Sequence, residues 1–451
     1  MDTYVISDKD NLLGKKEEPQ VAEMFFVNKH FPIEIEVIAD TIGFGLIKEE
    51  WNDLVSRSNN HIFQTHEWQY TWWNYFGDNR HLNIILFRKN SELVGIMPLF
   101  VDHFKILDKN ICNVLRFIGS SVMQPSEAEF DVPLAFSDYL DIIVDPDYVN
   151  EVITTLNLYF DKVQGYYDEI ILDEVPEKSY LLTSLTSILD TENWDYAVKT
   201  ASNCPGIFLP GSWEGFVSSF SKHARSQIRR FVKRASNSEL FNISTAHTDE
   251  EVKHAFDLLV KLHQQRWQNQ GQPGIFKCPR MLGFLREVTL LLNKKGWVLL
   301  NVVDEDGNEV AADLSYVYKN SIYMMQRGFD DEAPSNKYGP GTVLLYKTIK
   351  NAIESGYNYF DFLRGEEDYK LRSSNNIRHN KEIIIRSTTA GFKKRTILAG
   401  IVKNIINLKR KLIVESEIMM IQFERHHAVK ALFKYIELIF NRLKRKIKAS
   451  Q

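Results

Sequence analysis

In the second half of the chain, the spacing of apolar residues switches between the period typical of strands and the period typical of helices. The predicted elements are a strand at 241–247, helices at about 249–270 and 279–295, three strands within 297–330, a helix at 341–356 and a strand at 357–365. The Asp306-Gly307 pair predicts a tight turn between the first two strands of the meander. A right-handed crossover then places the last strand parallel to the strand that precedes the helix.

The first half repeats this order more loosely. It predicts a strand at 33–39, helices near 46–58 and 65–77, a hairpin within 82–104, an extended segment at 138–146, a helix at about 147–163 and a strand at 166–175. An internal repeat predicts two tandem lobes of one α/β plan with mixed sheets. Prolines and glycines at 205–211 place the boundary. We therefore expect a tail at 1–32, lobes at 33–203 and 204–390, and a basic helical tail at 391–451.

Composition supports real cores and excludes global disorder. Hydrophobic residues make up 44% and charged residues 25% of the 451 residues. The first twenty residues mix acids with lysines, so we expect neither a signal peptide nor a membrane anchor there. Cys112, Cys204 and Cys278 match no disulfide framework or zinc spacing. These features favour a reducing cytoplasm and a protein without a metal site.

Charge is distributed unevenly along the chain. Residues 392–451 carry fifteen lysines and arginines against four glutamates, a local charge of +11. Since the whole chain carries -4, residues 1–391 sum to about -15. Helical spacing of apolar and basic residues over 392–448 leaves two interpretations of the tail: it docks on the acidic body, or it lies peripherally on an anionic membrane surface.

A glycine-bearing loop before a helix offers a site for phosphate in the second lobe. Lys337, Tyr338, Gly339 and Gly341 precede or open that helix, whose free N–H groups and dipole favour an anion. An ordinary helix entry with proline at its first turn explains the loop equally well. The matching loop of the first lobe carries Asp145 and Asp147, which cap a helix and repel anions. A donor with phosphates is therefore expected in the second lobe.

Three carboxylates are candidates for acid–base work. Asp361 and Glu366 follow the last strand, where a carboxylate beside the cleft can take a proton from an attacking amine or hydroxyl. Asp313 lies in the strand AADLSYVY and can face the same cleft or simply face water. Arg364 can instead hold Asp361 in a salt bridge, which would make this cluster structural.

Two further features have structural alternatives. A basic helical stripe can contact phosphates of a ligand or be a solvated face; it consists of Lys222, Arg225, Arg229 and Lys233. In FQTHEWQYTWW, His66 and Trp68 are candidates for contact with an acceptor. Helical spacing of the tryptophans favours a packing role, and a cap is the alternative for His66.

Several motifs together resemble the GNAT acyltransferase superfamily, in its double-lobed branch with CelD/BioF2-like acetyltransferases and FemABX aminoacyltransferases. They are FQTHEWQYTWW (63–73), LVGIMPL (93–99), FSKHARSQIRR (220–230), RGFDDEAPSNKYGPGTVLLYKTIKNAI (327–353) and YFDFLRGEEDYK (359–370). The likeness covers about residues 34–390. The loop has Gly-Pro-Gly where the ordinary pattern has Gln/Arg-x-x-Gly-x-Gly/Ala, so the identity of the donor stays open.

The resemblance implies direct acyl transfer from a donor that lies between splayed strands near Gly328 and Tyr357. An acetyl-CoA or other acyl-CoA donor would contact residues of the strand end and the loop, namely Arg327, Gly328, Lys337, Tyr338, Gly339, Gly341 and Thr342. A strand N–H would polarise its carbonyl. The acceptor would contact residues of both lobes, namely Arg364, Tyr369, Lys370, His66 and Trp68.

The expected function is N- or O-acylation of a small-molecule or glycolipid acceptor, a sugar or amino-sugar intermediate of surface polysaccharide or cell wall. Two alternatives stay open: an aminoacyl-tRNA-dependent peptidoglycan-precursor transferase, and a non-catalytic binding or assembly protein. The acidic body counts against nucleic acid as a partner.

Overall fold

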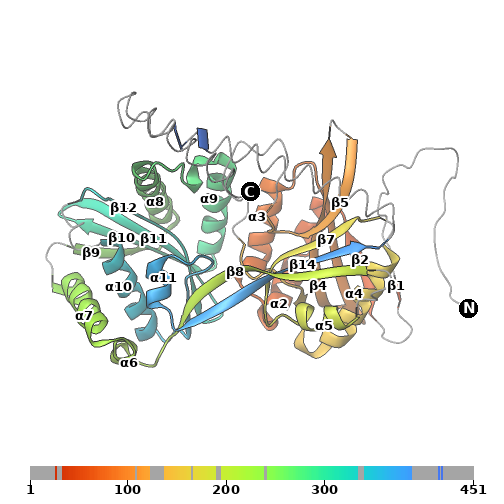
Figure 1. The fold of residues 1–451 in the computed structure, drawn as a ribbon, viewed down its shortest axis with the longest axis horizontal. Helices are drawn as coiled ribbons and strands as arrows, with labels where there is room; N and C mark the ends of the chain where they lie inside the picture. Colours follow the sequence, from red (N-terminus) through yellow and green to blue (C-terminus); the bar gives the residue numbers. More distant parts are fainter. Residues whose placement is uncertain are drawn as a thin grey trace, which may run out of the picture.

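The computed structural model describes residues 26–27, 33–106, 109–121, 137–163, 166–188, 194–237, 241–333, 340–388, 415–416 and 418–419. The strands within these residues form one mixed sheet of fourteen strands, with helices packed on it in both lobes (Figure 1). The predicted mixed α/β class is confirmed. The basic tail falls almost entirely outside the described residues.

The first lobe builds its sheet from the N-terminal half of the chain. Its elements are β1 (Phe26–Val27), β2 (Glu34–Ile38), α1 (Thr41–Leu46), α2 (Lys48–Arg57), α3 (His66–Phe76), β3 (His81–Lys89), β4 (Glu92–Ile106), β5 (Lys109–Phe117), β6 (Ile143–Val144), α4 (Val149–Lys162), β7 (Glu169–Pro176) and α5 (Tyr180–Ile188). The extended segment expected at 138–146 contributes only the short β6. Tyr139 has φ 58°, which interrupts an extended run there.

The second lobe follows the predicted order closely. Its elements are β8 (Trp194–Phe208), α6 (Trp213–Ser218), α7 (Lys222–Asn237), β9 (Phe241–Ala246), α8 (Asp249–Asn269), α9 (Pro279–Asn293), β10 (Val298–Glu305), β11 (Asn308–Tyr318), β12 (Ser321–Phe329), α10 (Pro340–Glu354), β13 (Tyr359–Asp361), α11 (Asp368–Ser373) and β14 (Asn376–Ser387). Strands β10, β11 and β12 form the antiparallel meander. The predicted parallel pairing of β12 with β13 is confirmed.

Strand order shows that the two lobes repeat one plan. The order is β1-β2-β3-β4-β5-β7-β14-β8-β13-β12-β11-β10-β9. The first lobe begins at the edge strand β1, the second begins at the edge strand β9, and the lobes meet at the central pair β14 and β8. Both lobes contain a parallel pair beside the centre, β5 with β7 and β12 with β13. The repeat in the sequence is therefore also a repeat in space.

Two long strands join the lobes by exchange. Strand β8 follows the first lobe in sequence but pairs with β13 of the second, while β14 ends the second lobe and pairs with β7 of the first. The two strands also pair with each other (Figure 1). The boundary expected between residues 203 and 204 falls inside β8, which continues through Pro205 and Gly206 because β13 and β14 flank it there.

One hydrophobic cluster spans both lobes. Trp68 of α3 packs edge-on against Phe284 of α9, with ring centroids 5.2 Å apart, and against Tyr316 of β11 at 5.7 Å. Lys319, in the turn before β12, donates to the carbonyls of Val55 and Ser58 at the end of α2, at 2.5 and 2.6 Å. Packing and these hydrogen bonds fix the lobes against each other.

Candidate active site

Strands β12 and β13 separate at the centre of the second lobe. They pair only from Ser321 with Tyr359 to Tyr323 with Asp361, although β12 continues to Phe329. After Asp361 the chain instead follows β8, where Phe362 N–H donates to the carbonyl of Pro205 at 2.9 Å. A register shift against β11 also falls in β12 at this point. The expected splay thus begins immediately after Tyr323 and Asp361.

Helix α10 begins close to the far end of β12. A β-carbon added at Gly341 would come within 3.0 Å of the Phe329 ring, so this glycine permits close approach of helix and strand. Arg327 donates to the carbonyl of Gly341 at 3.0 Å and pairs with Asp313 at 3.3 Å. Thr342 is half-buried beside it. The expected donor residues Lys337, Tyr338 and Gly339 lie outside the described residues.

The guanidinium of Arg327 is only partly hydrogen-bonded within the described residues. Its Nε is buried and has no hydrogen-bond partner within the described residues. Its guanidinium also lies 6.0 Å from the centre of the Tyr369 ring. An orphaned donor beside the start of a helix can receive an anionic group.

Gly328, which is expected to contact the donor, lies directly against helix α8. A β-carbon there would lie 2.7 Å from the amide nitrogen of His263 and 2.8 Å from the carbonyl oxygen of Leu259, both in α8. This glycine therefore allows α8 to pack directly on the backbone of β12.

The candidate carboxylates Asp313 and Asp361 project to opposite faces of the sheet. Asp313 is fully buried on the face covered by α10, where Arg327 is its ionic partner. Burial raises the pKa of Asp313, and the charge of Arg327 opposes that shift. Asp361 and Tyr323 project to the other face, toward the first lobe, where Tyr139 and His61 contact them. The two carboxylates cannot act on the same atom.

Asp361 is enclosed by three donors. Its carboxylate accepts from the Tyr139 hydroxyl at 2.7 Å and from the amide nitrogen of Leu363 at 2.8 Å, and it pairs with Arg378 at 3.3 Å. Burial raises the pKa of Asp361 to about 6, although Arg378 and both hydrogen bonds lower it. Glu366, the other candidate base, is exposed at the rim and accepts from Asn203.

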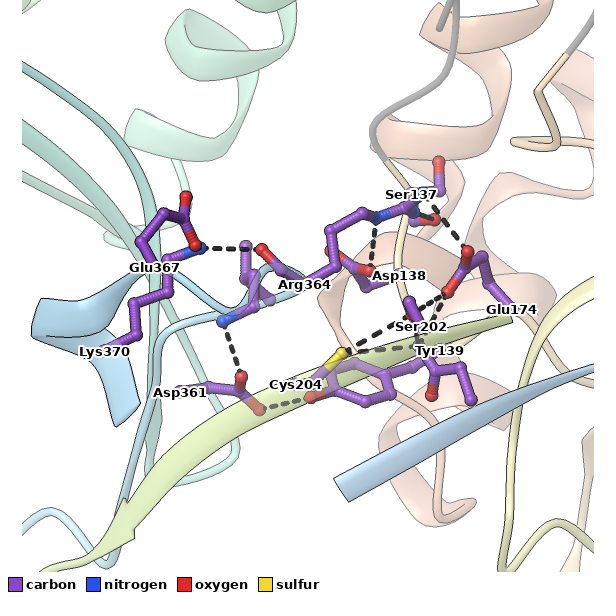
Figure 2. Close-up of polar contacts among 12 residues, drawn as sticks. Ser137, Asp138, Tyr139, Glu174, Ser202, Cys204, Asp361, Arg364, Glu367 and Lys370 are labelled. Carbon is purple, nitrogen blue, oxygen red and sulfur yellow. Dashed lines mark hydrogen bonds and ion pairs between the residues drawn. The ribbon is translucent and has the colours of Figure 1, made fainter. Parts of the chain in front are cut away.

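Arg364 bridges the lobes rather than pairing with Asp361 (Figure 2). It contacts Asp138 at 2.7 Å, Glu174 at 3.2 Å and the carbonyl of Ser137. The salt bridge considered between Arg364 and Asp361 is therefore wrong; Arg378 from β14 takes that place. Burial raises the pKa of Asp138 to about 6 against the charge of Arg364.

Lys370 and Tyr369 hold the turn after β13. Lys370 is buried and donates to the carbonyl of Arg364 at 2.6 Å, and its ammonium pairs with Glu367 at 3.1 Å (Figure 2). Tyr369 is partly exposed and packs edge-on against Phe362. Lys370 thus stabilises the turn that carries Arg364.

Three residues around this network have left-handed backbone conformations without being glycine. Their φ angles are 58° for Tyr139, 56° for Glu174 and 57° for Leu363. The backbone amide of Leu140 donates to the carbonyl of Glu174 at 3.0 Å, which ties two of the segments together. Such conformations persist where surrounding contacts hold them, and they concentrate at functional sites.

His61 completes the network from the first lobe. Its Nδ1 lies 2.9 Å from the Tyr323 hydroxyl, and its ring lies 4.6 Å from that of Tyr139. Burial, with the charges of Arg378 and Lys319, lowers the pKa of His61 to about 3. His61 is therefore neutral at neutral pH.

His66 lies in the core of the first lobe, and Trp68 lies in the core between the lobes. The ring nitrogen of His66 is 2.8 Å from the carbonyl oxygen of Phe44, and its ring stacks on Tyr70. Trp68 is fully buried and donates to the Ser137 hydroxyl at 2.8 Å. These are the contacts of packing residues, as the helical spacing indicated for Trp68; the N-cap of this helix is Thr65 and not His66.

Sequence reasoning missed the residues around Asp361 and Arg364 that come from other elements, namely His61, Asp138, Tyr139, Glu174, Tyr323 and Arg378. Within the described residues no group of three or more His, Cys, Asp or Glu side chains is arranged to hold a metal ion. No helix there has the length and apolarity needed to cross a bilayer.

Part of this geometry lies in a region that matches the model of a known domain family. The model of the acetyltransferase (GNAT) domain matches residues 222–371. The FemX structure shares 12% identity over 74% of this chain and 95% of its own, with a TM-score of 0.51. A conserved protein of unknown function from Bacteroides thetaiotaomicron shares 12% identity over 78% of this chain and 99% of its own, with a TM-score of 0.46.

L-PGS from Bacillus licheniformis shares 13% identity over 81% of this chain and 96% of its own, also with a TM-score of 0.46. Among curated proteins none matches the chain. At these identities the likeness to FemX concerns the fold. The matched domain contains the splayed strands, α10 and the turn after β13. The second lobe therefore carries a region that matches the acetyltransferase (GNAT) domain.

Proposed function

We propose that the protein is an acetyl-CoA-dependent N- or O-acyltransferase that acts by direct transfer on a sugar or amino-sugar intermediate of surface polysaccharide or cell wall. The observation that carries the proposal is the splay of β12 from β13 beside the start of α10, within the matched acetyltransferase domain. Bound acetyl-CoA would supply the activated acyl group. The sugar acceptor follows from the resemblance to acetyltransferases of polysaccharide gene clusters.

The residues at the start of α10 fit the phosphate end of such a donor. Gly341 leaves room that a side chain would fill, and Arg327 has a buried Nε without a partner within the described residues. The helix dipole adds positive potential at the same place. The carboxylate of Asp313 pairs with the guanidinium of Arg327 at 3.3 Å and so fixes its orientation.

The reacting end of the donor would lie at the splay. Beyond Tyr323 the edge of β12 that faced β13 has no strand partner within the described residues, so its N–H groups can polarise a carbonyl. An acceptor would approach on the face that carries Tyr323 and Asp361. Asp361 is already engaged by three donors, which suits a positioning role better than proton abstraction.

Calorimetry with acetyl-CoA tests this proposal. Replacing Gly341 with aspartate places a side chain and a negative charge beside Arg327, and we expect the Kd to rise at least tenfold. An acid in the first turn of a helix favours the fold, but the new β-carbon would lie 3.0 Å from the Phe329 ring, so thermal denaturation is used to check that the variant folds. Gly211→Asp is the matched control, since a β-carbon at Gly211 meets nothing within 4 Å. If no acyl-CoA gives heat with the wild type, the donor assignment is wrong.

Titration with aminoacyl-tRNA examines the alternative donor. Binding to tRNA that falls steeply with salt, without binding to acyl-CoA, would replace our proposal by the aminoacyl-tRNA-dependent one.

A further inference from the structure

Helices α6 and α7 lie at the end of the second lobe that is farther from the first lobe (Figure 1). Residues 207–237 contain six lysines and arginines against one glutamate, a local charge of +5. Residues 1–391 together sum to about -15. The two helices therefore form a basic region on an acidic protein body.

Helix α7 places its apolar and basic residues on different faces. Ile228 and Val232 are buried, and the Phe231 ring stacks on the Tyr346 ring of α10, with centroids 6.3 Å apart. The remaining surface of the helix is its basic face, which consists of Lys222, Arg225, Arg229, Arg230 and Lys233. Arg225 is half-buried, and the other four residues are exposed. The fold thus uses the apolar side of α7 for packing and leaves the basic face at the surface.

Most charges of the basic face have no counter-charge nearby. Arg229 pairs with Glu214 of α6 at 2.9 Å, and both side chains are more than half exposed. The other four basic side chains form no ion pair within the part of the chain that the structure describes. Salt screens exposed charges over about 8 Å, so the acids of the distant first lobe do not cancel this local potential.

Aromatic side chains accompany the basic face. Trp213 of α6 is half-buried and directly precedes Glu214, the residue that the Arg229 guanidinium contacts. Phe208, at the end of the strand that leads into α6, is 58% exposed. Partly exposed aromatic rings beside lysines and arginines are typical of surfaces that enter the boundary between lipid headgroups and acyl chains. These rings distinguish the corner from a merely solvated helix face.

We propose that α6 and the basic face of α7 dock the protein on an anionic lipid bilayer. The lysines and arginines contact lipid phosphates, and the Trp213 ring enters the headgroup region. A nucleic acid would attract the same charges, but it gives no reason for the partly exposed aromatic rings. The proposal does not depend on the identity of the acyl donor or of the acceptor.

Vesicle flotation of the full chain tests this docking. Vesicles of phosphatidylcholine, with and without phosphatidylglycerol, are compared at equal total lipid. We expect the wild type to float only with the phosphatidylglycerol vesicles, and to bind them more weakly in about 0.5 M salt. Each basic residue near an anionic surface strengthens partitioning by about fivefold. Replacing Lys222, Arg229 and Lys233 with glutamate should therefore lower the partition coefficient at least about 100-fold.

A second triple variant carries the same change of charge on another surface. Lys253 and Lys261 of α8 and Lys294, directly after α9, are all exposed. Their replacement with glutamate should leave the partition coefficient within threefold of the wild type. Circular dichroism and thermal denaturation check that both triple variants fold.

Quenching by brominated lipids tests the contribution of α6. Bromine on the acyl chains quenches tryptophan fluorescence only at short range, so bound wild type should lose fluorescence. Trp213→Phe should remove most of this quenching while the protein still floats. Quenching that is unchanged in this variant would contradict the insertion of α6.

Three further outcomes would overturn the docking. The wild type floats with neither kind of vesicle; or the α7 triple variant floats as well as the wild type, which places the contact elsewhere in the chain; or the wild type binds tRNA and not vesicles. None of these outcomes changes the acyl-CoA binding measured by calorimetry, so the docking and the proposed function fail separately.

Discussion

At the scale of single residues, the carboxylate of Asp141 shows how burial links charge to stability. It accepts from the Ser179 hydroxyl at 2.5 Å and from the amide nitrogen of Ile142 at 2.8 Å. Burial raises its pKa to about 7 against these hydrogen bonds. The folded protein therefore binds this proton more tightly than the unfolded chain. The contribution of the protonated Asp141 carboxyl to stability is fully present below about pH 4 and is lost as the pH rises through about 7.

We predict that Asp141→Asn stabilises the protein at pH 8 by about 1 to 2 kcal/mol, a value reduced for partial solvent screening, and changes little at pH 4. Asparagine can still accept from Ser179 but carries no charge to desolvate. Urea denaturation at the two pH values measures the difference. Asp53→Asn, at a side chain that is 70% exposed, should shift stability equally little at both. An equal gain for Asp141→Asn at both pH values would contradict this explanation.

Residues of the site differ in how far sequence could predict them. Asp361 was proposed because it follows a strand of a strongly periodic unit, and Arg327 because it opens a motif that resembles the acyltransferase family. Their partners could not be identified: Tyr139 meets Asp361 across 222 positions, and His61 meets Tyr323 across 262. These contacts depend on how the lobes face each other, which no local period encodes. Arg364 was considered as a possible ionic partner of Asp361, but its guanidinium extends to Asp138 across the lobe interface.

At the scale of elements, helix α8 lies directly on strand β12 at Gly328. We predict that Gly328→Ala lowers the free energy of unfolding by about 2 to 3 kcal/mol, since the new methyl group meets helix backbone that cannot rotate away. Thermal and chemical denaturation measure the loss. Gly211→Ala adds the same group in open space and should stay within about 0.5 kcal/mol of wild type. Equal effects at both glycines would contradict the packing argument.

Element prediction succeeded where local pattern decides structure. The apolar period and the Asp306-Gly307 turn were sufficient for the meander and the helices around it. Strand β8 was not expected to run through Pro205 and Gly206. Its partners β13 and β14 lie more than 150 residues later, and pairing on both sides outweighs the local preference of these residues for a turn.

At the scale of the whole molecule, the exchange of β8 and β14 makes the lobes depend on each other. Strand β7 of the first lobe would be an open edge without β14, which comes from the end of the second lobe. Strand β13 likewise has β8 as its neighbour on the side away from β12. Such connections favour one cooperative folding unit over two domains that unfold separately.

We predict that truncation after residue 375, which removes β14, destabilises the distant first lobe as well as the second. Hydrogen exchange followed by mass spectrometry should show faster exchange across Glu169–Pro176, because β14 pairs with β7 from Glu169 to Pro176. Truncation after residue 388 keeps β14 and is the matched control. If Glu169–Pro176 exchanges equally slowly in both truncated proteins, the first lobe is stable without the exchanged strand, and the lobes are independent units joined only in sequence.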